Sequence, residues 1–182
     1  MLPTPCYVIG DAHLGVASKE VERSLIAFLR QLPGRARSVV IMGDLFDFWF
    51  SWRHVMPRAG FRVLAAIADL RDAGVEILWI GGNHDCWGGE ALEMETGVHY
   101  TLEPWLNDIG AWRTLLQHGD GLREREDAPY RRLRGVLRNS LAIRPGARVP
   151  RVYDHRRRAH LLRLSRSICK AQFGHRRCAG TV

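Results

Sequence analysis

Residues 79–86 read WIGGNHDC, and this short stretch decides the fold. The apolar run Ile77–Ile80 predicts a buried strand, which stops at two glycines and is followed by Asn83, His84 and Asp85. Side chains of these three types bind metal ions or exchange protons. A buried strand that ends abruptly in such groups predicts a functional site just beyond its carboxyl end.

Two other apolar runs end in the same way. Cys6–Ile9 predicts a strand and is followed closely by Asp11 and His13. Val39–Met42 predicts a second strand and is followed, after one glycine, by Asp44. Any one of these polar residues, taken alone, is explained by ordinary turn chemistry. Their repetition at successive strand ends indicates one shared site.

Between these strands, apolar residues recur at helical spacing. Helices are predicted over 21–29 and 64–70, with a short one at 90–95, and the segment 100–117 is predicted to hold two strands, the second of which runs into His118. Strands that alternate with helices favour an α/β fold whose parallel strands all end at one edge of the sheet. Ligands of such sheets bind beyond that edge.

The residue types at the strand ends predict a metal site. Asp11 and His13 are two residues apart, so in an extended segment both side chains project to one side and can hold one ion. Carboxylate, imidazole and carboxamide groups without a thiolate suit Mn²⁺, Fe or Zn²⁺, and Mn²⁺ is our first choice. Asp44 is the natural bridge, because one carboxylate can join two metal ions about 3.5 to 4 Å apart.

Four sequence blocks together resemble the signature of the calcineurin-like metallophosphoesterases, which is Asp-x-His, Gly-Asp-x-x-Asp, Gly-Asn-His-Asp (or -Glu) and His-Gly-Asp. The corresponding blocks of this chain are Asp11-Ala12-His13, Gly43-Asp44-Leu45-Phe46-Asp47, Gly82-Asn83-His84-Asp85 and His118-Gly119-Asp120. The resemblance covers about residues 5–142. Within that family it is strongest to the UDP-2,3-diacylglucosamine diphosphatases of lipid A synthesis, on GDLFDFWF at 43–50 and on residues 118–139.

The resemblance implies a fold and a set of metal ligands. The fold is an α/β sandwich of mixed β-sheets flanked by helices. Two divalent metal ions, most suitably Mn²⁺, would be bound in it. Asp11 and His13 would bind one ion, Asp44 would bridge the pair, and Asn83 and His118 would bind the second ion.

The resemblance also implies catalytic and substrate-binding residues. His84 would contact a phosphate oxygen or protonate the leaving group, and Asp85 would orient His84. The best-known enterobacterial-type members have arginine in place of this histidine. Asp127 and Tyr130 match positions that contact the sugar of the substrate, although Tyr130 can equally be a core aromatic on a helix face.

The implied reaction is hydrolysis of the pyrophosphate of UDP-2,3-diacylglucosamine by a metal-activated water, which releases UMP and 2,3-diacylglucosamine 1-phosphate. Near the site, Trp49, Phe50 and Trp52 have two interpretations, packing beneath the site or an apolar wall along acyl chains or uracil. The four cysteines show neither close pairing nor the density of a disulfide scaffold, so we expect free thiols, with Cys86 a bystander.

The net charge of +8 is concentrated at one end of the chain. Residues 151–182 hold nine Lys or Arg and one acid, which leaves 27 − 9 = 18 basic and 19 − 1 = 18 acidic residues in 1–150. We therefore predict a metallophosphoesterase domain over 1–142 and a basic, divergent tail over 143–182.

The tail departs from the family pattern, which ends in a Gly-His-x-His block. The nearest match here is Gly174-His175-Arg176-Arg177. Three explanations remain open: a membrane-seeking basic tail, a truncated or frame-shifted C-terminus that leaves the fold incomplete, or a chain that kept the fold and lost the activity. We favour the second, because apolar periodicity is lost where the charge shifts.

The N-terminus has no basic segment ahead of its short apolar run, so neither a signal peptide nor a membrane span is predicted there. We expect a cytoplasmic enzyme in peripheral contact with the inner face of the membrane, with a UDP-linked lipid as substrate and no nucleic acid as partner. The alternatives are a metallophosphoesterase acting on another phosphodiester, such as nucleic acid, and an inactive remnant with a basic binding tail.

Overall fold

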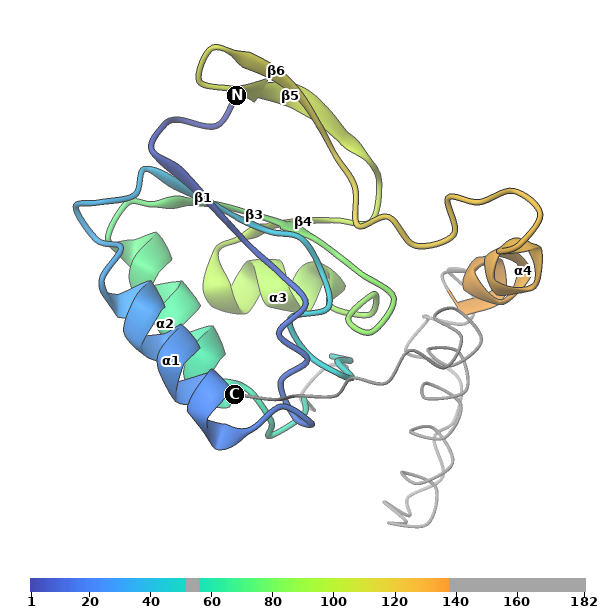
Figure 1. Ribbon diagram of the computed structural model, residues 1–182. Coiled ribbons are helices and arrows are strands. Elements are labelled where there is room, and N and C mark those ends of the chain that lie inside the picture. The colour runs from blue at the N-terminus through green and yellow to red at the C-terminus, as the bar shows by residue number, and fades with distance from the viewer. Residues whose placement is uncertain (52–55, 138–182) are drawn as a thin grey trace, which may run out of the picture. The chain divides into compact units, whose positions relative to one another are not determined.

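The computed structural model describes residues 1–51 and 56–137 (Figure 1). The described residues fall into two units, Met1–Asp120 and a second unit that begins at Gly121. The predicted boundary at 142/143, the basic tail and Trp52 lie outside the described residues.

The first unit is built on a parallel sheet with the strand order β1-β2-β3-β4. These strands are β1 (Cys6–Ile9), β2 (Ser38–Ile41), β3 (Glu76–Ile80) and β4 (His99–Thr101). All three pairings within the sheet are parallel. The predicted α/β fold class is therefore confirmed.

Three helices cover one face of this sheet, as Figure 1 shows. They are α1 (Lys19–Arg30), α2 (Phe61–Asp72) and α3 (Gly89–Thr96). The apolar stripes of α1 and α2 pack on the strand residues that face them, among them Val39, Ile77 and Trp79, to form the main core. The helices predicted over 21–29, 64–70 and 90–95 lie inside these three.

An antiparallel hairpin covers the opposite face of the sheet (Figure 1). It consists of β5 (Trp105–Ile109) and β6 (Trp112–Leu116). Val40 and Leu78, paired in register in the sheet, pack with residues of the hairpin in a second apolar cluster. Because β2 and β3 are buried from both sides, they read as continuous apolar runs rather than alternating ones.

One detail differs from the sequence prediction. The segment 100–117 was expected to supply two strands, and it does supply the hairpin, but β4 begins just before it and adds a short strand to the parallel sheet. The second unit contains α4 (Ala128–Leu137). Of the helices that the structure describes, none is both long and apolar enough to cross a membrane.

A candidate metal centre at the carboxyl ends of the strands

The loops that follow β1 and β2 run side by side and hold the first candidate ligands. The backbone N–H of Asp11 donates to Gly43 O (3.1 Å), and the N–H of His13 donates to Asp44 O (3.0 Å). Asp11, His13 and Asp44 have φ values of 51°, 43° and 49°, in the left-handed region that non-glycine residues rarely adopt. The extended segment predicted for Asp11 and His13 is therefore wrong, because pairing with the neighbouring loop twists the backbone there.

One consequence of this twist is that Asp11 and His13 belong to different clusters of potential ligands. Asp11 joins Asp44 and His118, with one ligand atom from each lying within 4.8 Å of the others. His118 Nε2 lies 3.4 Å from Asp44 Oδ2 and 3.3 Å from Asn83 Oδ1. Four of the five predicted metal ligands thus converge on one place.

The ring of His118 is fixed from its other nitrogen, since Nδ1 donates to Met42 O at 2.7 Å. Burial alone would lower the pKa of His118, but the hydrogen bond and charge of Asp44, with smaller contributions from Met42 O and Asp120, raise it to about 9. Burial would likewise raise the pKa of Asp44, yet its contacts with His118 and His84 bring it below its usual value. The metal-free chain therefore carries an imidazolium–carboxylate pair here.

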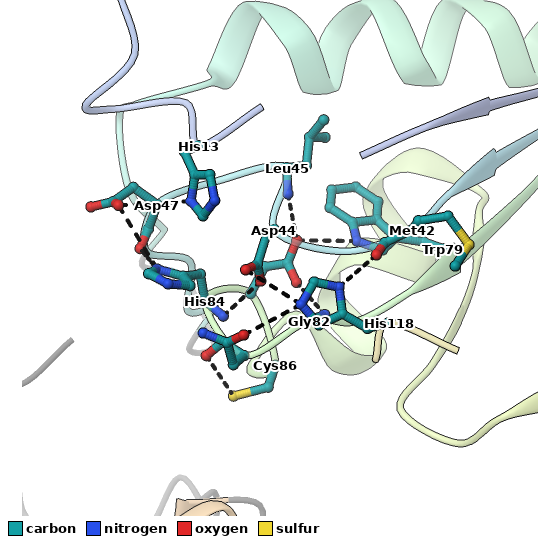
Figure 2. A network of polar contacts seen from close by, with 12 residues as sticks. His13, Met42, Asp44, Leu45, Asp47, Trp79, Gly82, His84, Cys86 and His118 are labelled. Atoms are coloured by element: carbon teal, nitrogen blue, oxygen red, sulfur yellow. Dashed lines mark hydrogen bonds and ion pairs between the residues drawn. The ribbon is translucent and has the colours of Figure 1, made fainter. Parts of the chain in front are cut away.

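The second cluster contains His13, Asp47 and His84, again with ligand atoms within 4.8 Å of one another. Asp47 Oδ1 lies 3.9 Å from His13 Nδ1 and 3.8 Å from His84 Nδ1. His84 Nδ1 also lies 2.5 Å from the main-chain oxygen of Asp47. The rings of His13 and His84 meet edge to face, with their centroids 4.9 Å apart. One carboxylate thus faces two imidazoles (Figure 2).

Asp47 was missing from the residues predicted for the site. A signal for it was present in the sequence, because Asp47 is the second carboxylate of the Gly-Asp-x-x-Asp block. Spacing alone does not tell toward which histidine such a carboxylate turns. The structure places it between the two, with Oδ1 3.9 Å from His13 Nδ1 and 3.8 Å from His84 Nδ1.

Asp85 does not have the surroundings predicted for it. Its carboxylate is fully buried and accepts from the backbone N–H of Gly82 (2.7 Å) and Leu45 (3.1 Å) and from Trp79 Nε1 (3.3 Å). Those three bonds direct the carboxylate to two loop backbones and to the Trp79 ring rather than to His84. Burial, and then the charge of Asp44, raise the pKa of Asp85 to about 6.

The donor set of the centre fits divalent metal ions. It combines carboxylate oxygens with imidazole nitrogens, and His118 has the outer hydrogen bond that usually orients a ligating histidine. Within residues 1–51 and 56–137, the buried His13 Nδ1 has no hydrogen-bond partner, which is unusual for a buried polar atom and is consistent with a ligand bound there. The thiol of Cys86 contacts the main-chain oxygen of Asn83 at 3.8 Å.

The aromatic residues after Asp47 divide between packing and partial exposure. Trp49 is buried and stacks on Phe46 with ring centroids 4.6 Å apart, so its packing interpretation is confirmed. Phe50 is half-buried and meets Phe48, which in turn contacts Trp87 edge to face.

The two predicted substrate-binding residues belong to the second unit. The carboxylate of Asp127 accepts from the backbone N–H and the guanidinium of Arg123, and these bonds lower the pKa of Asp127. Tyr130 lies in α4 and is half-buried. Their contact with a sugar remains a prediction.

Comparison with known proteins identifies the family of this chain. The profile of the family described as Calcineurin-like phosphoesterase matches residues 4–156. The chain belongs to this family, as its four sequence blocks indicated.

Several individual proteins similar to this chain share one description. The chain is 36% identical over 149 residues to a UDP-2,3-diacylglucosamine hydrolase of Porphyromonas gingivalis, covering 76% of this chain and 57% of the relative. Proteins described by the same words are 33% identical in Nitrosococcus oceani (88% and 62% covered) and 30% identical in Pseudomonas paraeruginosa (87% and 65% covered). The chain spans less than two thirds of the length of each of these relatives.

One solved structure was also compared. A protein of unknown function from Aquifex aeolicus aligns over 72% of this chain and 71% of its own, with a TM-score of 0.46 and 18% identity.

Proposed function

We propose that this chain is a metal-dependent hydrolase that cleaves the pyrophosphate of UDP-2,3-diacylglucosamine into UMP and 2,3-diacylglucosamine 1-phosphate. The observation that carries the proposal is the convergence of Asp11, Asp44 and His118 within 4.8 Å at the strand ends of a calcineurin-like phosphoesterase fold. The choice of substrate is supported by relatives described as UDP-2,3-diacylglucosamine hydrolases at 30% to 36% identity.

The proposal assigns the metal ligands by donor type. Asp11, Asp44, Asn83 and His118 would hold the ions together with His13, and Mn²⁺ is the ion that we expect. Bound ions of this kind neutralise phosphate charge and lower the pKa of water. Asp44, which is shared between its neighbours on both sides, is the residue suited to bridge them.

His84 is assigned the proton transfer. Because its Nδ1 faces the main-chain oxygen of Asp47 at 2.5 Å, we assign one proton to Nδ1. To act as a proton donor, the ring would carry a second proton on Nε2, and that N–H would contact the phosphate oxygen or the leaving group. The main-chain oxygen of Asp47 fixes the orientation of the ring, and the carboxylate oxygen of Asp47 lies 3.8 Å from the same nitrogen. A proton delivered in this way to the departing oxygen offsets the charge that develops there.

A lipid-linked nucleotide substrate also implies where in the cell the enzyme acts. We propose that the enzyme acts on the cytoplasmic face of the membrane, in peripheral contact with it. Asp127 and Tyr130 are proposed to contact the sugar of the substrate.

The test is Mn²⁺-dependent release of UMP from UDP-2,3-diacylglucosamine by the purified chain. His118→Ala is expected to lower the rate at least about 100-fold, because it removes a ligand. His99→Ala is the matched control, since the His99 side chain is 69% exposed and pairs with Glu93 on the surface. Its rate is expected to equal that of the unmodified chain.

The same preparation is then offered a generic phosphodiester and single-stranded DNA. Release of UMP as the fastest reaction supports the proposed substrate. Faster cleavage of DNA would replace it with a nuclease assignment, and a folded chain that binds Mn²⁺ but cleaves none of the three substrates would refute the proposed activity.

A further inference from the structure

Asp85 is a buried acid whose hydrogen bonds join the two loops that carry Asp44 and Asn83. Its Oδ1 accepts from Gly82 N–H in its own loop at 2.7 Å. Its Oδ2 accepts from Leu45 N–H, in the loop after β2, at 3.1 Å. The side chain therefore connects the loop after β2 to the loop after β3, and these loops carry two predicted metal ligands.

A second hydrogen bond joins the same two loops in the opposite direction. Asp44 Oδ1 accepts from the backbone N–H of His84 at 3.0 Å. Each loop thus supplies a carboxylate that accepts a hydrogen bond from the backbone of the other loop. The donor Leu45 is next in sequence to Asp44, and the donor His84 is next to Asp85. We call these two bonds, Asp44 to His84 N–H and Asp85 to Leu45 N–H, the loop clasp.

The clasp acts on backbones that touch. A Cβ added to Gly43 would lie 2.6 Å from Gly82 N, and a Cβ on Gly82 would collide with the carboxylate of Asp44. No side chain can therefore act as a spacer between the loops, and their separation depends on backbone contact and the clasp. The clasp also restrains Asp44, whose left-handed backbone is costly and persists only when its surroundings determine it.

We infer that Asp85 is a positioning residue for the metal centre, whose carboxylate sets the Asp44 loop against the Asn83 loop so that both ligands are in place before a metal ion arrives. The inference rests on the proposed function in taking Asp44 and Asn83 as ligands. It gives Asp85 no contact with substrate.

A carboxylate is required for this task because every partner is a donor. Gly82 N–H, Leu45 N–H and Trp79 Nε1–H all point at its two oxygens. In Asp85→Asn, the amide nitrogen replaces one acceptor with a donor and faces at least one of these N–H groups. The shape of the side chain is preserved while the clasp or its anchor at Gly82 is broken.

The experiment measures Mn²⁺ affinity by calorimetry on the full chain at 25 °C, for the unmodified protein and for Asp85→Asn. The expected result is binding weakened roughly 10- to 100-fold, the range found when outer residues of metal sites are changed. Tyr100→Phe is the matched control. It removes a hydroxyl that donates to the main-chain oxygen of Asp85 at 2.9 Å, so it loosens the same loop without touching the clasp.

The outcomes separate positioning from ordinary stabilisation. If Asp85→Asn lowers the melting temperature but binds Mn²⁺ as tightly as Tyr100→Phe does, Asp85 is only structural and the inference is overturned. If raising the Mn²⁺ concentration restores kcat of Asp85→Asn, the inference is supported. An unmodified chain that binds no Mn²⁺ overturns the proposed function, and the inference with it.

A second measurement needs no variant, and so decides the matter even if Asp85→Asn does not fold. Hydrogen exchange of the Leu45 and Gly82 amides is compared in the unmodified chain without metal and with Mg²⁺. Preorganisation predicts that both amides are already protected without metal. Rapid exchange of Leu45 that slows only when metal is added would show that the metal, rather than Asp85, brings the loops together.

Discussion

The affinity of the centre for Mn²⁺ is expected to rise steeply with pH, because His118 must lose a proton before it can bind a metal ion. In the metal-free chain its Nε2 lies between Asp44 Oδ2 at 3.4 Å and Asn83 Oδ1 at 3.3 Å. A proton on Nε2 can be shared with both oxygens, so it occupies the position that the ion needs. The competition between proton and metal follows from this geometry.

The magnitude comes from the pKa of His118, about 9 in the metal-free chain. A pH of 7 lies about 2 units below that pKa. The need to remove the proton therefore weakens metal binding at pH 7 about 100-fold relative to the deprotonated ring, or by about 2.7 kcal/mol at 1.36 kcal/mol per unit. The raised pKa means that the imidazolium stabilises the metal-free fold fully below pH 6.5, and that this contribution is lost as the pH rises through about 9. Below pH 9, the affinity for the metal ion therefore rises about tenfold for each increase of one pH unit.

Calorimetry between pH 6.5 and 8.5, in two buffers of different ionisation enthalpy, measures both quantities. We expect about one proton released from His118 for each ion bound at its site. His99→Gln is the control and is expected to leave the slope unchanged, because His99 is exposed and remote from the clusters. An affinity that is independent of pH, with no proton released, would refute the assignment of His118 as a protonated ligand.

Three further substitutions test the site and its surroundings. His84→Asn is expected to lower kcat roughly 10²- to 10⁴-fold with Mn²⁺ affinity unchanged; a loss of affinity in calorimetry would make His84 a ligand instead. Asp47→Asn is expected to lower kcat by a smaller factor with little change in KM, because Asp47 faces the histidine rings; a rise in KM alone would contradict this. Gly82→Ala is expected to destabilise the chain by at least about 1–3 kcal/mol in urea unfolding, since its Cβ collides with Asp44, whereas Gly135→Ala has no neighbour within 4 Å and should cost nothing.

Much of the fold was predictable because its signals are local. Each buried strand is a short apolar run that ends in glycine, and each helix repeats its apolar residues at helical spacing. The short strand β4 was not predicted. It begins at His99, covers three residues, and owes its place to pairing with β3 rather than to any pattern of its own.

Most residues of the site were predictable from the sequence, but their arrangement in space was not. Parallel strand ends deliver side chains to one edge by topology, so the shared edge of Asp44 and Asn83 followed from the order of the blocks. His118 reaches the same place from the antiparallel hairpin, after β6, which the rule for parallel sheets does not predict. The loops themselves have no periodicity from which a direction can be derived. The left-handed backbone at Asp11 and the turn of Asp85 toward Leu45 depend on contacts between loops far apart in the sequence.

The charges of the centre explain why protonation of His118 and metal binding oppose each other. Asp44 and Asp85 are buried carboxylates, and burial together with the charge of Asp44 raises the pKa of Asp85, so holding both charges in place requires a compensating cation. Without metal, that cation is the protonated ring of His118 beside Asp44. An incoming ion must therefore displace the proton of His118 and break the contact of this ring with Asp44. A chain that binds metal must gain more from the ion than it loses with this proton, which is why we expect His118 to dominate the pH dependence of binding.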